Sequence, residues 1–178
     1  MPDALIAVLD ANVLYPPTLR DFLLATAASG FYAPRWSDEI LDEVARNLAK
    51  RMTPENAARL VGGMRELFPK ALVEGYERHL PGLANEEKDR HVVATALEAT
   101  APLIVTGNRR DFSPLPASLQ AIEADDFLCG FLDAKTELIR CVDRVRKLWP
   151  SPPSASAYLA QLGKLAPRFA AEMRQYYR

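Results

Sequence analysis

Four carboxylates in this chain have the type and position to do chemistry. Asp10 ends the apolar run Ala4-Leu5-Ile6-Ala7-Val8-Leu9. Glu43 and Asp89 lie in segments with helical spacing of apolar residues, and Asp111 closely follows a second apolar run. A carboxylate at the end of a buried strand is costly to desolvate unless a cation or hydrogen bonds compensate it. The four positions therefore predict one acidic site.

Carboxylates gathered without histidine or cysteine form a hard-oxygen site, which suits Mg²⁺ or Mn²⁺ and not Zn²⁺. Such a cluster needs cations to stay ionised, because like charges at close range repel. Its main chemical use is phosphoryl transfer, in which the metal acidifies a bound water and screens the charge of the phosphate. Any one of the four acids taken alone could instead be a helix cap or a surface charge.

Helical geometry separates the candidates further. At about 100° per residue, Asp89 projects near the centre of the apolar stripe of residues 86–99. Glu43 lies at the edge of the stripe of its own segment, with Asn47 one turn later. We therefore expect Asp89 and Glu43 to point inward. The same projection puts His91 on the far side of its helix, so His91 is not assigned to the acidic cluster.

Six polar residues beside the acids could assist them. Asparagine and threonine side chains could orient the carboxylates through hydrogen bonds, and arginines could bind substrate phosphates. The candidates for orientation are Asn12, Thr106 and Asn108, and those for phosphate binding are Arg90, Arg109 and Arg110. Each could instead serve a turn, a helix cap or a solvated surface.

The elements that must position these residues indicate an α/β domain. Short, uninterrupted apolar runs at 4–9 and 103–106 are typical of strands buried on both faces of a parallel sheet, and 119–124 could add an edge strand. Ligands of such sheets bind beyond the carboxyl ends of the strands. Helices are predicted at 18–29, 38–48, 54–68, 86–99, 126–134 and 135–148, with two short helices within 156–177 and mostly loop at 69–85. The predicted caps of the first four of these helices are Thr18, Ser37, Thr53 and Asn85.

Length and composition fit one globular domain with an appendage. The chain has 178 residues, of which 49% are hydrophobic and 25% charged. We expect an α/β domain over residues 1–128 and a helical extension over 129–178, with a proline-rich hinge at 150–153. The net charge of −1, from 22 basic and 23 acidic residues, does not by itself indicate a nucleic-acid-binding protein.

The sequence also predicts a location. Cys129 and Cys141 lack metal-type spacing and are expected to be free thiols in a reducing compartment. Neither a charged leader nor an apolar stretch of membrane-spanning length is evident. A cytoplasmic protein with no membrane partner is the expectation.

Four segments, in this order, resemble the PIN domain, and most closely the VapC-type toxins of bacterial toxin–antitoxin pairs. They are Val8–Leu14, Glu39–Glu43, Lys88–Ala96 and Ile104–Phe112. The likeness covers about residues 3–128. One departure is Lys88, at a position where the family often has another acid.

The resemblance implies a Rossmann-like sheet and a Mg²⁺- or Mn²⁺-dependent endoribonuclease. Asp10, Glu43 and Asp89 match the family's invariant acids, and Asp111 with Asn108 matches a more variable fourth position. Water as the nucleophile would leave 5′-phosphate and 3′-hydroxyl ends on the RNA. The implied protein partner is an antitoxin that blocks the acidic crevice with a basic side chain.

The extension carries one further apolar stripe. Leu138, Val142, Val145 and Leu148 recur with helical spacing. This stripe could pack within the chain, or it could bind an antitoxin or a second copy of the chain as a homodimer.

Two other functions are compatible with the sequence. Haloacid-dehalogenase-like phosphatases also use an aspartate at the end of their first strand, but they place a second aspartate two residues later, where this chain has Asn12. A PIN scaffold that binds RNA or protein without cleavage is the other alternative. Candidate acids at all four positions favour the nuclease.

Overall fold

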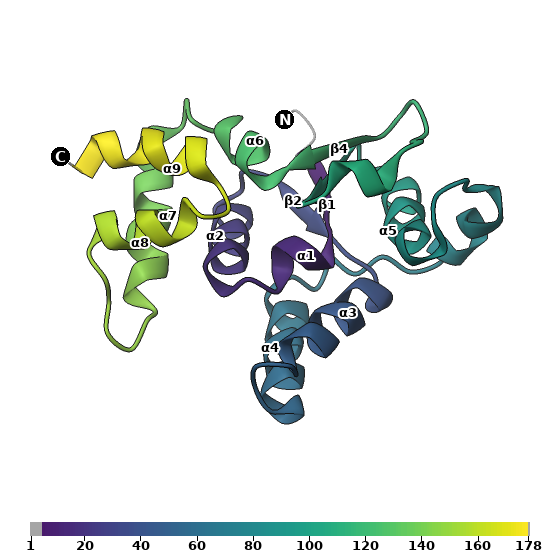
Figure 1. Ribbon diagram of the computed structural model, residues 1–178, viewed down its shortest axis with the longest axis horizontal. Helices are drawn as coiled ribbons and strands as arrows, with labels where there is room; N and C mark the ends of the chain where they lie inside the picture. The colour runs from purple at the N-terminus through teal and green to yellow at the C-terminus, as the bar shows by residue number, and fades with distance from the viewer. Residues whose placement is uncertain (1–4, 178) are drawn as a thin grey trace.

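A four-stranded parallel sheet forms the centre of the molecule in the computed structural model, which describes residues 5–177 (Figure 1). Its strand order is β2-β1-β3-β4. The strands are β1 (Ile6–Leu9), β2 (Ala33–Arg35), β3 (Leu103–Thr106) and β4 (Gln120–Glu123). Ala4, the first residue of the predicted apolar run, lies outside the described residues. The predicted parallel α/β fold is confirmed.

Helices flank the sheet, with α5 on one side and α2 and α6 on the other (Figure 1). The α-helices are α1 (Ala11–Leu14), α2 (Pro17–Ala28), α3 (Asp38–Leu48), α4 (Pro54–Leu67), α5 (Glu87–Glu98), α6 (Ala124–Cys129), α7 (Lys135–Lys147), α8 (Ala155–Leu162) and α9 (Pro167–Arg174). Three short 3₁₀ helices are η1 (Tyr76–Gly82), η2 (Arg109–Phe112) and η3 (Gln175–Tyr177).

Two of the four predicted helix caps are confirmed. The side chain of Ser37 accepts a hydrogen bond from the backbone N–H of Ile40, and that of Thr53 accepts one from Asn56. The prediction for Thr18 is wrong, because α2 begins at Pro17 and Thr18 lies within its first turn. The prediction for Asn85 is also wrong. The amide group of Asn85 instead donates to two backbone carbonyls of the η2 region, and Glu86 precedes the first turn of α5 without a side-chain cap.

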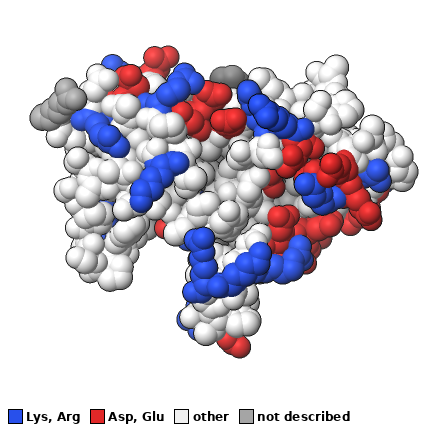
Figure 2. All heavy atoms as spheres, in the orientation of Figure 1, with Lys and Arg blue, Asp and Glu red and all other residues white. Residues whose placement is uncertain are grey.

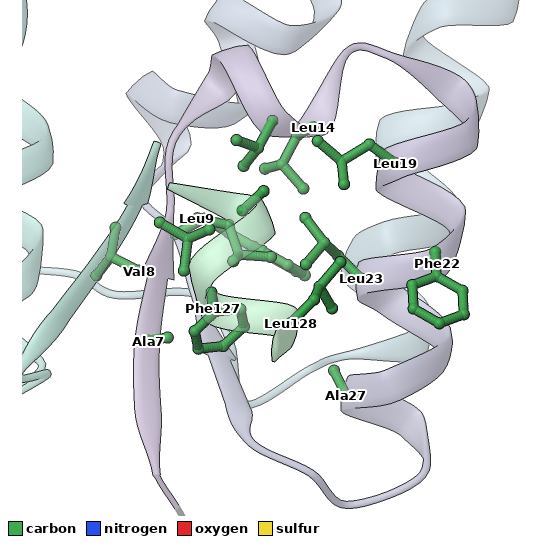
Figure 3. Packing of buried hydrophobic residues seen from close by; sticks show 14 of the residues in the cluster. Ala7, Val8, Leu9, Leu14, Leu19, Phe22, Leu23, Ala27, Phe127 and Leu128 are labelled. Atoms are coloured by element: carbon green, nitrogen blue, oxygen red, sulfur yellow. The ribbon is translucent and has the colours of Figure 1, made fainter. Parts of the chain in front are cut away.

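The core lies where β1 packs against the helices on one side of the sheet (Figure 3). Strand β1 is so apolar because its side chains are buried on both faces of the sheet. The labelled residues on this side are Ala7, Leu9, Leu14, Leu19, Phe22, Leu23, Ala27, Phe127 and Leu128, whereas Val8 points to the opposite face of the sheet. This packing fixes the end of β1 relative to the helices, and therefore the position of Asp10, the next residue.

The C-terminal helices share the core of the α/β domain. The ring of Phe22 on α2 lies 5.3 Å from that of Phe169 on α9 and 6.5 Å from that of Tyr158 on α8. The carboxylate of Asp125 on α6 accepts hydrogen bonds from the backbone N–H groups of Arg168 and Phe169. The extension is therefore joined to the sheet domain by buried contacts, while the boundary between residues 128 and 129 stays a prediction.

Most of the apolar stripe of α7 packs inside the molecule. Leu138, Val142 and Val145 are buried, whereas 74% of Leu148 is exposed. Cys129 and Cys141 are both free thiols, as expected. Within residues 5–177, no helix is both long and apolar enough to span a bilayer.

Candidate active site

Thr106 is at the centre of a hydrogen-bond network that holds Asp10 at the carboxyl edge of the sheet. Leu9 pairs with Val105 in the parallel register, so the next residues of the two strands, Asp10 and Thr106, are neighbours. The Thr106 hydroxyl donates to Asp10 Oδ2 at 2.8 Å. Asn12 Nδ2 donates to the same hydroxyl at 3.0 Å. Because the Thr106 oxygen accepts the bond from Asn12, the Thr106 hydroxyl proton is available for the Asp10 carboxylate.

The loop after β3 completes this network through its backbone. The N–H of Gly107 donates to Asn12 Oδ1 at 2.8 Å, and the N–H of Asn108 donates to Thr106 Oγ1 at 3.1 Å. Asn12 and Thr106 therefore lie where the sequence predicted an orienting role. Asn108 contributes its backbone, while the residue itself is exposed.

All four predicted acids line one cavity of about 540 Å³ beside this network. Asp10 reaches it from the end of β1, Glu43 from α3, Asp89 from the first turn of α5 and Asp111 from η2. Figure 2 shows acidic side chains gathered on this side of the molecule, next to basic ones. Segments far apart in the sequence thus bring their carboxylates to a single hollow.

The acids differ in exposure. Asp10 is buried, and the side chain of Asp89 is 15% exposed. The Oδ2 atom of Asp89 is fully enclosed and has no hydrogen-bond partner among residues 5–177. Glu43 and Asp111 are more open to solvent. Asp10 and Asp89 are therefore the carboxylates that most need a compensating charge.

The protein environment raises the pKa of both carboxylates. Burial raises the pKa of Asp10 from 3.8 to about 6, and the negative charges of Glu43 and Asp89 add to the rise, while the Thr106 hydrogen bond opposes it. Burial also raises the pKa of Asp89; Lys88 counteracts this shift and Asp111 reinforces it. A cation in the cavity would favour the ionised form of both groups.

The expectation that His91 points away from the acids is wrong. His91 is buried and lines the cavity, with Nε2 3.8 Å from Glu43 Oε2 and Nδ1 3.9 Å from Glu39 Oε1. In the part of the chain that the structure describes, neither ring nitrogen has a hydrogen-bond partner. The helical projection failed because α5 is covered on more than one face: it contacts the sheet, α3 and η1. The face of α5 opposite the stripe that packs on the sheet therefore contacts protein and not solvent.

The structure does not bring the three predicted phosphate-binding arginines into this cavity. The side chain of Arg90 donates to the backbone carbonyl of Asn85 at 2.7 Å. Arg109 and Arg110 line a neighbouring hollow of about 360 Å³, and Arg109 lies 3.6 Å from a carboxylate oxygen of Glu123.

Three other basic residues line the acidic cavity, and sequence reasoning missed two of them. Lys88, noted above as a departure from the family pattern, has its Nζ 3.9 Å from carboxylate oxygens of both Asp89 and Asp111. Arg46 comes from the last turn of α3, and Lys50 comes from the turn just after the helix ends. For Arg46, its spacing of three residues from Glu43 on the same helix was a usable signal, because residues three and four positions apart share a helix face.

The donor set fits a hard divalent cation in its chemistry. The acids supply only oxygen, and the enclosed Oδ2 of Asp89 accepts no hydrogen bond from the residues that the structure describes, with Lys88 Nζ 3.9 Å away. Within residues 5–177, however, no three histidine, cysteine, aspartate or glutamate side chains are gathered closely enough to hold a metal ion. The acids therefore share a cavity in this arrangement without forming a complete coordination shell.

Comparison with known proteins identifies the family. The family model of the PIN domain matches residues 6–110, which is more than half of the chain. The chain belongs to the PIN domain family. The PIN match includes Asp10, Glu43 and Asp89 and ends one residue before Asp111, so the helical extension lies wholly outside it.

One curated relative is "Putative ribonuclease VapC50" of Mycobacterium tuberculosis (strain ATCC 25618 / H37Rv). It is 33% identical to this PIN-domain chain over 112 residues, which cover 60% of this chain and 66% of the relative. No solved structure matches the chain.

Proposed function

We propose that this PIN-domain chain is an endoribonuclease that hydrolyses RNA phosphodiesters with the help of Mg²⁺ or Mn²⁺. The observation that carries the proposal is the cavity at the carboxyl edge of the sheet, which Asp10, Glu43, Asp89 and Asp111 line from four separate segments. The ribonuclease in the name of the curated relative supports RNA as the substrate.

In this proposal Asp10, Glu43 and Asp89 hold the cation, and Asp111 contributes to it or positions water. When bound, such a cation acidifies water and offsets the negative charge of the phosphate. Thr106 keeps one oxygen of Asp10 hydrogen-bonded, which fixes the direction of the carboxylate. Asn12 sets the direction of the Thr106 hydroxyl, so both residues act on the reaction through Asp10.

The proposal includes a role as the toxin of a toxin–antitoxin pair in the cytoplasm. The antitoxin would place a basic side chain among the acids of the cavity, where opposite charge is least screened. The VapC name of the relative supports this role. A second copy of the chain is a further proposed partner.

The test compares Asp10→Asn and Asp89→Asn with Asp42→Asn. Asp42 is an exposed acid of α3 outside the cavity lining, so it controls for loss of one charge. We expect cleavage of single-stranded RNA in Mg²⁺ or Mn²⁺ to stop on chelation and to fall by more than about 100-fold in the two cavity variants only. Calorimetric binding of Mn²⁺ should weaken in the same two variants.

Two results would contradict the proposal. Tight RNA binding by the parent protein without cleavage in either metal would indicate a non-catalytic binding module. Hydrolysis of a small phosphomonoester in place of RNA would indicate a phosphatase.

A further inference from the structure

We infer that Arg46, in the last turn of α3, and Lys50, in the turn just after it, form a phosphate-binding subsite that receives the RNA strand next to the acids. The inference rests on the proposed function and names the part of the cavity that binds the substrate. It replaces the arginines expected from the sequence with two residues that the fold brings to the site.

Helix α3 and the turn that follows it carry both signs of charge into the cavity. Glu39 and Glu43 line it from the helix, Arg46 from the last turn of the helix, and Lys50 from the turn just after the helix ends at Leu48. With a rise of about 1.5 Å per residue, Arg46 lies about 4.5 Å along the axis from Glu43, and Lys50 lies farther on in the same direction along the chain. A strand whose scissile phosphate lies at the acids would therefore meet the two cations with its neighbouring phosphates.

The acids of α3 form no ion pair with either of the two cations. Glu43, three residues before Arg46, faces His91 at 3.8 Å instead, and so does Glu39 at 3.9 Å. The Nζ of Lys50 donates to the neutral side chain of Asn47 at 2.8 Å. Among residues 5–177, Arg46 and Lys50 have no carboxylate partner within ion-pair distance.

Both cations are also accessible to a polymer. Arg46 and Lys50 are exposed, and Figure 2 shows basic side chains running along the region of α3 beside the acidic cluster. A guanidinium and an ammonium both bind phosphate oxygens, and such contacts do not depend on base sequence. The arrangement suits the backbone of a single strand.

The other basic residues near the site are less suited to this role. The charge of Lys88 is already shared by Asp89 and Asp111. Arg90 is bound to a backbone carbonyl, and Arg109 is paired with Glu123 outside the cavity.

The experiment measures the salt dependence of RNA binding in an Asp10→Asn background, which keeps the RNA intact. Fluorescence anisotropy of a labelled single-stranded RNA in Mg²⁺ follows the affinity over a salt series. The test variant is Arg46→Gln/Lys50→Gln. Two comparison variants remove two charges elsewhere: Arg109→Gln/Arg110→Gln beside the neighbouring hollow, and Arg140→Gln/Lys147→Gln at exposed positions of α7.

We expect Arg46→Gln/Lys50→Gln to lower the slope of log affinity against log salt by about 1.4, since each phosphate contact contributes about 0.7. At ordinary salt this corresponds to an affinity about ten-fold weaker. The α7 variant should bind like the parent, and the charge-conserving Arg46→Lys/Lys50→Arg should restore the slope. Thermal unfolding of each variant shows whether the helix is intact, because cations near a helix C-terminus also favour the helix.

An unchanged slope in Arg46→Gln/Lys50→Gln would overturn the inference, as would an equal or larger loss in either comparison variant. Cleavage by the chain with native Asp10 is measured separately. Cleavage together with an unchanged slope would contradict only the proposed subsite. RNA binding that depends on Arg46 and Lys50, without any cleavage, would support the subsite and contradict the proposed nuclease activity.

Discussion

Thr106 is the residue on which the direction of the Asp10 carboxylate most depends. Its hydroxyl has one proton, which goes to Asp10, and its oxygen accepts bonds from Asn12 and from the backbone of Asn108. Removing the hydroxyl leaves the buried Asp10 without its side-chain donor and leaves the Asn12 amide without its acceptor.

We therefore expect Thr106→Val to lower RNA cleavage by about 10- to 100-fold, the range typical of groups that orient metal ligands. The free energy of unfolding should fall by about 1–3 kcal/mol, because buried polar groups lose a partner. Thr106→Ser keeps the hydroxyl and should retain most of the activity. Full cleavage by the valine variant would show that the hydrogen bond does not matter for the reaction.

The raised pKa of Asp10 predicts a pH dependence of stability in the metal-free protein. Between pH 3.8 and about 6, folded Asp10 holds a proton that the unfolded chain has lost. The free energy of unfolding should therefore fall as the pH rises through this window, by up to roughly 3 kcal/mol from this group. The raised pKa of Asp89 acts in the same direction.

Urea denaturation in a chelator across this pH range tests the prediction. Asp10→Asn cannot ionise, so its stability should decrease less steeply with pH than that of the parent. Parallel stability curves for the two proteins would mean that Asp10 titrates normally.

At the scale of single elements, α3 is the helix that matters most for the site. It carries Glu43 and Arg46, it leads directly to Lys50, and its first turn is fixed by the buried side chain of Ser37. Helix α4 starts with the same kind of cap, Thr53, which is exposed, but it lines no part of the cavity. The two caps make the same hydrogen bond at helices that differ in their contact with the site.

Ser37→Ala and Thr53→Ala should each lower the free energy of unfolding by about 1 kcal/mol, the usual cost of losing such a cap. Only Ser37→Ala should also lower RNA cleavage, because α3 presents an acid to the cavity and α4 does not. Chemical denaturation and a cleavage assay measure the two effects. An equal loss of cleavage in Thr53→Ala would show that the effect is one of general stability.

At the scale of the whole molecule, the C-terminal helices and the sheet domain should unfold together. Phe169 of α9 lies far outside the segment that matches the PIN domain. Its side chain is fully buried and packs on Phe22 of α2, which lies within that segment. The Asp125 carboxylate ties the first turn of α9 to α6. These contacts make the extension part of one core.

Phe169→Ala should lower the free energy of unfolding by about 3–5 kcal/mol through the cavity that it leaves. Leu165→Ala, at a partly exposed position between α8 and α9, should cost less than about 0.5 kcal/mol. Circular dichroism and tryptophan fluorescence should report coincident transitions in the parent protein. Two separated transitions would mean that the extension folds on its own.

Local patterns in the sequence predicted the features that depend on nearby residues. The run at 103–106 became β3, and Ser37 and Thr53 cap their helices, because strand burial and capping are read from a few adjacent positions. The order and type of the four acids were likewise evident, since each follows a strand or sits on a helix whose apolar face is visible. Strand β2 was missed because Ala33-Pro34-Arg35 has no apolar pattern, and proline is tolerated there only because β2 is an edge strand.

Tertiary packing decided what shares the cavity with the acids. His91 faces Glu43 because α3 covers the side of α5 that a single-helix projection assigns to solvent. Arg46 and Lys50 line the cavity although the arginines next to the acids in sequence do not. The reason is physical: sequence spacing fixes which face of a helix a side chain occupies, but only the contacts between distant elements determine what that face meets.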